Sequence, residues 1–273
     1  FGGVSMINRA QIKENAKQAL KPRFGLAIVV SLITFILAGG SGGLGGGLGS
    51  FNGFRIIYSN PSDNGSNGDV SGYPFADLKD FFTNNVGVST MIITIIAILI
   101  FFAAVSALMY NIFVAGPVTV GNSRYYLMNR LGYGDIGTLF SVFKPGYLNI
   151  VKGVLIKGIY IFFFSFFFFI PGIIKIFEYS MVEYILAENP NLNAHEALNL
   201  SSRMTDGKKA EIFVFQLSFL GWALLAGLTC GIGVIFLRPY IEASWAELYA
   251  TLREEAILKG TVDYEEFCPG SAF

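Results

Sequence analysis

Four stretches of this chain are apolar for longer than a helix in the core of a soluble protein needs to be. They cover residues 24–48, 88–114, 150–170 and 212–237. Each holds about 20 residues or more, and at about 1.5 Å per residue such a helix crosses a hydrocarbon layer about 30 Å thick. The sequence therefore predicts an integral membrane protein and excludes most classes of soluble enzyme.

Composition supports this prediction. Hydrophobic residues make up 53% of the chain and charged residues 14%, whereas a soluble domain carries about 25% charged residues. The formal net charge is zero, and the chain has two cysteines and one histidine. So few Cys and His side chains provide neither a disulfide framework nor a metal cluster. We therefore expect no cofactor, no metal and no nucleic-acid partner.

Basic residues indicate how the chain is threaded through the membrane. If residues 171–210 formed one external loop, their lysines and arginines would lie outside the cell. That arrangement conflicts with the preference of basic loops for the cytoplasm. The conflict disappears if the chain turns at Pro171-Gly172 and returns through the membrane over residues 173–188.

A second return is expected at a pair of glycines further along the chain. A single helix over residues 211–237 would be about 40 Å long, which exceeds the thickness of the hydrocarbon layer. Broken at Gly231 and Gly233, the segment becomes one span outward and one span back. Arg238-Pro239 lies in the returning span, and the restriction that proline places on the preceding residue predicts a kink or a half-span there.

The predicted fold is an all-α integral membrane protein with about six transmembrane helices, arranged as three helical hairpins, with both termini in the cytoplasm. A basic amphipathic cytoplasmic segment (1–23) precedes the membrane domain (24–250), and a polar cytoplasmic tail (251–273) follows it. An external loop is expected over residues 49–87. The spans are expected at residues 24–48, 88–114, 150–170, 173–188, 211–229 and 232–249.

Ile12, Ala16 and Leu20 recur at helical spacing in the basic segment, opposite a row of lysines. This pattern predicts a short amphipathic helix that lies on the anionic cytoplasmic leaflet. A solvated turn next to the membrane is the alternative.

The second helix of each hairpin shares a sequence pattern. Residues 178–183 align with residues 242–247, and residues 116–126 resemble residues 238–245. Three repeated hairpins would explain these matches, although matches this few also arise by chance. If the repeat is real, the second, fourth and sixth spans are equivalent. Short spans interrupted by Gly or Pro in equivalent positions are typical of binding sites.

Ionisable side chains lie on two of these spans. The candidate ligand-binding residues are Lys175, Glu178 and Glu183 on the fourth span and Arg238 and Glu242 on the sixth. Ionisable groups at membrane depth are costly unless they are paired or hydrated, so these should face one another, a cavity or the headgroups. They form either a polar site between hairpins or, as the structural alternative, pairs that fix the register of the helices.

Several segments carry motifs of a known family: residues 8–20, 116–121, 178–181, 184–190, 196–198, 217–222, 228–233 and 239–240. Together they resemble multi-pass membrane proteins of Gram-positive bacteria, catalogued as a domain of unknown function (family 975). That resemblance implies the bacterial plasma membrane and a six-helix domain, and it transfers no catalytic residue. A more distant similarity to the membrane domain of some bacterial glycerophosphodiester phosphodiesterases suggests lipid contact.

No catalytic residue is predicted, because the chain lacks a second histidine and a nucleophile motif, and His195 is expected at the surface. We favour a non-enzymatic integral membrane protein that binds lipid or a partner protein, with a homo-oligomer as one form of partner. The first alternative is a transporter or channel for a small solute or ion, using the polar faces of the fourth and sixth spans. The second is a membrane enzyme that acts on lipid headgroups.

Overall fold

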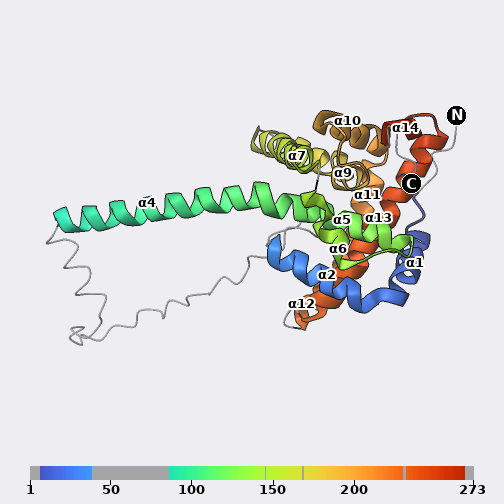
Figure 1. Cartoon of the computed structure of the whole chain (residues 1–273), viewed down its shortest axis with the longest axis horizontal. Helices are drawn as coiled ribbons and strands as arrows, with labels where there is room; N and C mark the ends of the chain where they lie inside the picture. Colours follow the sequence, from blue (N-terminus) through green and yellow to red (C-terminus); the bar gives the residue numbers. More distant parts are fainter. Residues whose placement is uncertain (1–6, 39–85, 145, 168, 230–231, 268–273) are drawn as a thin grey trace, which may run out of the picture. The chain divides into compact units, whose positions relative to one another are not determined.

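The computed structural model describes residues 7–38, 86–144, 146–167, 169–229 and 232–267, and all regular structure there is helical (Figure 1). The all-α prediction is confirmed for these residues, whereas most of the predicted external loop lies outside them. The helices are α1 (Arg9–Leu20), η1 (Lys21–Arg23), α2 (Phe24–Leu37), α4 (Val86–Tyr110), η2 (Asn111–Ala115), α5 (Gly116–Arg130), α6 (Ile136–Phe140), η3 (Ser141–Phe143), α7 (Tyr147–Phe167), α8 (Phe169–Glu178), α9 (Val182–Glu188), α10 (Ala194–Thr205), α11 (Lys209–Leu217), α12 (Leu220–Leu228), α13 (Ile232–Leu258) and α14 (Tyr264–Phe267).

The chain forms two compact units. One comprises residues Phe1–Phe51 and Asn111–Phe273, and the other comprises residues Asn52–Tyr110. The described structure of the smaller unit is α4, whose 25 residues include no charged side chain. A helix that is apolar on every side suits a lipid environment.

In the part of the chain that the structure describes, four helical segments are long and apolar enough to cross a membrane, which indicates a membrane protein. They correspond to the first, second, third and fifth predicted spans. The predicted fourth span is divided between α8 and α9, and the predicted sixth lies within α13, which carries charged residues along its length. The four segments are Arg9–Leu37, Thr90–Arg130, Tyr147–Phe167 and Lys209–Leu228.

The chain reverses direction after α7, but earlier than predicted. α7 ends at Phe167 and α8 begins at Phe169, and a Cβ atom on Gly172 would collide with Ser165, so the two helices lie side by side. Pro171 and Gly172, which were predicted to make the turn, lie inside α8 instead. Proline is tolerated in the first turn of a helix because the N–H groups there have no partner within the helix.

The predicted break between the fifth and sixth spans is confirmed, since α12 ends at Leu228 and α13 begins at Ile232. Residues 230–231, which include part of the predicted glycine turn, lie outside the described residues. α13 then continues for 27 residues with Pro239 inside it, so no half-span forms at Arg238-Pro239, whereas the kink expected there as the alternative stays a prediction. Packing outweighs the backbone hydrogen bond that proline removes, because residues 241–250 are all buried.

Helices α5, α9 and α13 form the centre of the larger unit (Figure 1). The rings of Tyr184 on α9 and Tyr249 on α13 stack with their centroids 5.4 Å apart. α9 and α13 contain parts of the fourth and sixth predicted spans, whereas α5 begins after residue 114, where the second predicted span ends. Asn122, Ser180 and Ser244, which the sequence repeat makes equivalent, are all buried. Their central places are compatible with a repeat, which stays a prediction.

The predicted amphipathic helix forms as α1, with the Asn8 side chain capping its first turn. Its apolar residues Ile12, Ala16 and Leu20 are buried and pack against α13 rather than against lipid. The apolar face therefore packs on the bundle, and the expectation that the helix lies along the cytoplasmic leaflet stays a prediction. The three apolar side chains can be buried either in lipid or against the apolar face of another helix, and sequence periodicity does not distinguish these two partners.

The C-terminal segment packs on the bundle, although a polar tail was predicted there. α13 crosses the predicted boundary at residue 250, and Phe267 at the end of α14 is fully buried. Arg203 of α10 forms an ion pair with Glu266. The Arg203 guanidinium, together with the backbone N–H of Asp263, holds the pKa of the Glu266 carboxyl below its usual value.

α5 approaches α6 so closely at Gly121 that one added methyl group is expected to destabilise the fold. A Cβ atom on Gly121 would collide with the backbone carbonyl of Leu139, whereas nothing lies within 4 Å of the corresponding position on Gly158. We expect Gly121→Ala to lower the free energy of unfolding by about 1 to 3 kcal/mol through overpacking. Gly158→Ala serves as the control, and equal thermal unfolding of the two variants in detergent would contradict the packing.

Candidate functional site

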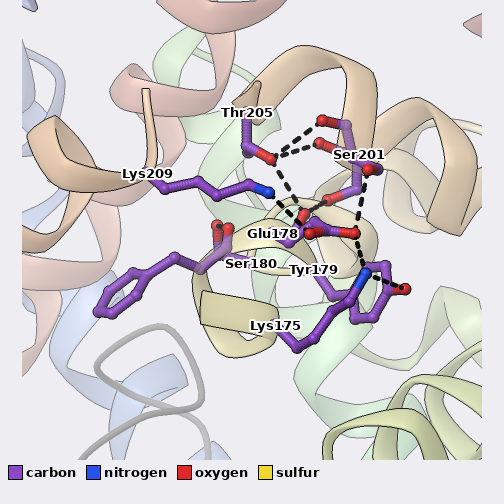
Figure 2. Close-up of polar contacts among 9 residues, drawn as sticks. Lys175, Glu178, Tyr179, Ser180, Ser201, Thr205 and Lys209 are labelled. Carbon is purple, nitrogen blue, oxygen red and sulfur yellow. Dashed lines mark hydrogen bonds and ion pairs between the residues drawn. The ribbon is translucent and has the colours of Figure 1, made fainter. Parts of the chain in front are cut away.

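Glu178, at the end of α8, is held by two lysines. Its carboxylate accepts hydrogen bonds from Lys175 Nζ at 2.5 Å and from Lys209 Nζ at 2.7 Å (Figure 2). Ser202 Oγ donates a third at 3.1 Å. Lys175 belongs to α8 itself, whereas Lys209 begins α11. The buried carboxylate is therefore neutralised from two helices.

The backbone of Glu178 is satisfied as well. Its carbonyl oxygen accepts hydrogen bonds from Ser201 Oγ at 2.7 Å and from Thr205 Oγ1 at 3.2 Å, both on α10 (Figure 2). The last carbonyls of a helix have no partner within it, so these hydroxyls cap α8. The carboxylate and the carbonyl of Glu178 are thus both hydrogen-bonded, and this joint of α8, α10 and α11 fixes the packing of the helices.

Glu183, in the first turn of α9, pairs with Lys157 of α7. The lysine Nζ lies 2.5 Å and 2.6 Å from the two carboxylate oxygens. Lys157 is only 6% exposed. A buried pair of this geometry offsets the cost of removing both charges from water, and loss of one partner leaves the other buried and uncompensated.

Arg238 and Glu242 form a looser pair within α13. The closest approach, from Arg238 Nε to Glu242 Oε1, is 3.9 Å, which is too long for a hydrogen bond. Both residues are buried, and Arg238 is 9% exposed. Three of their polar atoms, Nε and Nη2 of Arg238 and Oε1 of Glu242, are buried without a hydrogen-bond partner. This pair differs from the other two because its hydrogen bonds are incomplete.

Side chains from α2 and α5 surround this pair. Asn122 faces Glu242 and accepts a hydrogen bond from Thr34 Oγ1 at 3.2 Å. The hydroxyls of Ser31 and Tyr126 lie 2.7 Å apart beside them. The interior of the bundle therefore holds a polar network that links α2, α5 and α13.

The structure separates the five predicted site residues into two groups. Lys175 and Glu178 lie in the joint beside α10 and α11. Arg238 and Glu242 lie in the interior network, and the charge of Glu183 acts on Glu242 from α9. A single site that contains all five is not formed; the second group is the better candidate because it contains unpaired buried atoms.

Sequence reasoning missed two cations of these clusters, Lys157 and Lys209. Lys157 stands in an apolar helix of 21 residues, so the rule that selected Arg238 would also have selected it. Lys209 was treated as a residue of a cytoplasmic loop. Its long side chain reaches Glu178 from the start of α11, a contact that spacing along the chain does not reveal.

Contacts at one end of the bundle bring together segments that are far apart in the sequence. The backbone N–H of Ile7 donates to Glu211 at 2.7 Å, and Lys208 Nζ lies 3.1 Å from Glu255. The start of the chain, the α10–α11 connection and the end of α13 therefore lie at the same end of the larger unit. Among the residues that the structure describes, no group of three or more His, Cys, Asp or Glu side chains could hold a metal ion.

Comparison with known proteins identifies the family. Residues 81–256 match the family described as "Protein of unknown function (DUF975)". The chain belongs to this family. The DUF975 match runs from the approach to α4 into α13, so it includes all five predicted site residues and leaves out α1 and α2. No curated protein and no solved structure matches the chain.

The pair of Lys157 and Glu183 predicts a clear stability effect in this DUF975 protein. Lys157→Met should lower the free energy of unfolding by about 3 to 5 kcal/mol, because Glu183 would be left without its partner. The double variant Lys157→Met with Glu183→Met should recover most of that loss. Denaturation in detergent measures both, with Lys144→Met at an exposed position as the control. A double variant no more stable than the single one would contradict the pairing.

Proposed function

We propose that this DUF975 protein is a non-enzymatic integral membrane protein of the bacterial plasma membrane that binds anionic lipid through the basic face of α1. The contrast between buried and exposed charges carries the proposal. Buried charges of the bundle face opposite charges of the same chain, as Lys157 faces Glu183. The basic residues of α1 instead face outward, and an external anion is what they fit.

The basic face consists of Arg9 and Lys17 of α1 and Lys21 at the start of η1, all exposed. Glu14 is the one acidic residue of α1 and lies 3.6 Å from Lys17. η1 joins α1 directly to α2, which begins at Phe24, so this face lies where an apolar segment starts. Anionic headgroups attract each nearby Lys or Arg by about 1 kcal/mol.

We place this end of the bundle in the cytoplasm, with both termini on that side. The contacts of Ile7 with Glu211 and of Lys208 with Glu255 support a common side for the α1 segment, the α10–α11 connection and the end of α13. Basic residues favour the cytoplasmic face, where the anionic lipids also lie. Transport of a small solute is the second candidate function, and the unpaired edge of Arg238 favours it.

Lipid selectivity tests the proposal. The purified protein in detergent should bind phosphatidylglycerol more tightly than phosphatidylcholine, as measured by native mass spectrometry. Replacing Arg9, Lys17 and Lys21 together by glutamine should weaken phosphatidylglycerol binding by about tenfold or more, because three attractive charges are lost.

The matched control is a triple variant that carries Arg9→Lys, Lys17→Arg and Lys21→Arg. It changes the three side chains and keeps their positive charges. This variant should bind phosphatidylglycerol like the natural sequence. If the glutamine variant binds phosphatidylglycerol unchanged, or if the natural sequence does not distinguish the two lipids, α1 is not a lipid-binding surface.

A further inference from the structure

We infer that the free edge of the Arg238 guanidinium binds a carboxylate or phosphate-ester group, and that Glu242 takes up a proton when this group binds. The inference concerns the interior of the bundle and does not depend on lipid binding by α1. Three observations carry it: the direction of the unpaired donors, the position of Glu242 and the balance of charge.

The unpaired donors of Arg238 lie on one edge of its guanidinium. In this planar group, the Nε–H bond and one N–H bond of Nη2 point in the same direction. Two parallel donors at that spacing match the two oxygens of a carboxylate or phosphate, and Arg commonly binds these groups in this way. Both atoms are buried without a partner here, which is costly for a charged group. The Phe35 ring, 5.2 Å from Arg238 Cζ, contacts the guanidinium as a cation–π partner and supplies no hydrogen-bond acceptor.

Glu242 stands beside this edge without occupying it. Its Oε1 atom is 3.9 Å from Arg238 Nε and has no hydrogen-bond partner. Asn122 of α5, which accepts a hydrogen bond from Thr34 of α2, faces the same carboxylate. At 3.9 Å from Nε, Glu242 leaves both donors of the arginine free.

Charge balance then requires a proton. With Glu242 ionised, the pair is neutral. An anion on the free edge would lie next to Glu242 Oε1, and two like charges in contact in a buried site do not both stay ionised. One proton from the solvent forms an O–H bond on Glu242, no bond of the ligand breaks, and the site stays neutral. The new O–H group can donate a hydrogen bond to the bound anion.

Other titratable groups face Glu242 but are not placed to take this proton. Glu183 on α9 is already paired with Lys157. The phenols of Tyr126 on α5 and Tyr184 on α9 also face Glu242. Described residues of α2 and α12 include no titratable side chain, and the acidic residue of α1, Glu14, acts on Tyr240 instead.

A change in α13 can open the edge. Pro239 follows Arg238 directly and lacks the N–H group that would bond to the preceding turn, so the helix can bend at this position. Gly233 packs against Ala226 and Thr229 at the start of the same helix. Bending between these two points would move Arg238 relative to α2 and α5.

Isothermal titration of the purified full chain tests the inference. Acetate and methyl phosphate are the soluble probes, and short-chain phosphatidic acid in micelles is the lipid probe. Titration in two buffers of different ionisation enthalpy counts the protons. We expect uptake of about one proton per bound anion, and a Kd that rises by up to about tenfold per pH unit as Glu242 becomes ionised in the free protein.

Three variants separate the roles of the two residues. Glu242→Gln imitates the protonated acid, so it should bind the probe with no proton uptake and no pH dependence. Arg238→Gln should abolish binding, and Arg238→Lys should weaken it by about tenfold or more because lysine has no parallel pair of donors. Circular dichroism and gel filtration check that each variant is folded.

Several results would overturn the inference. They are absence of binding by every probe to both the natural sequence and the Glu242→Gln variant, unchanged binding by Arg238→Lys, and proton uptake that persists in Glu242→Gln. The lipid probe is measured in the variant that lacks the basic face of α1, so that failure of the α1 proposal stays distinguishable. Binding of phosphatidic acid alone would assign a lipid phosphate, and binding of the soluble probes a free anion.

Discussion

Neutralisation of charge inside an apolar bundle is the constraint on which the rest of this structure depends. A charged side chain that faced lipid would be costly, so the buried charges of the bundle lie close to opposite charges, on a neighbouring helix or on the same helix. Lys157 of α7 meets Glu183 of α9, and Lys209 of α11 meets Glu178 of α8. This requirement places α9 and α13 in the interior beside α5. The apolar faces of α7 and α12 point outward, where Leu228 is 81% exposed.

Apolar length and basic loops were enough to predict the all-helical class, the four longest apolar segments and a reversal after the third. The positions of the turns were harder to predict from the sequence, because Pro171 suits the first turn of a helix as well as a tight turn. The course of α13 through Pro239 depends on burial of residues 241–250, a tertiary effect. Periodicity identified the apolar face of α1 but not its partner, which is α13. For the site, intramembrane charge selected ionisable residues that the structure pairs or buries, whereas their division into two clusters follows from contacts between distant helices.

Two features of this DUF975 protein fit anions, and they differ in kind. The basic face of α1 is exposed and gathers several cations, which suits weak, sequential contact with headgroups. Arg238 is a single buried cation with an open edge and a carboxylate beside it, which suits one small group and a proton. In contrast, the cluster around Glu178 has its hydrogen bonds filled and serves the packing of α8, α10 and α11. Incomplete hydrogen bonding of a charged side chain therefore marks a candidate binding site, and complete hydrogen bonding marks a contact that fixes helix packing.

The central claim is that the chain reverses within the membrane so that the start of α1, α10 and the end of α13 share one side. Single cysteines at Gln11, His195 and Thr229, in a chain whose Cys230 and Cys268 are replaced by serine, test it most directly. All three positions are exposed. In intact cells, a membrane-impermeant maleimide should label the cysteine at position 229 alone, and those at 11 and 195 should react only after permeabilisation. Labelling of positions 11 and 195 from opposite sides would contradict the account.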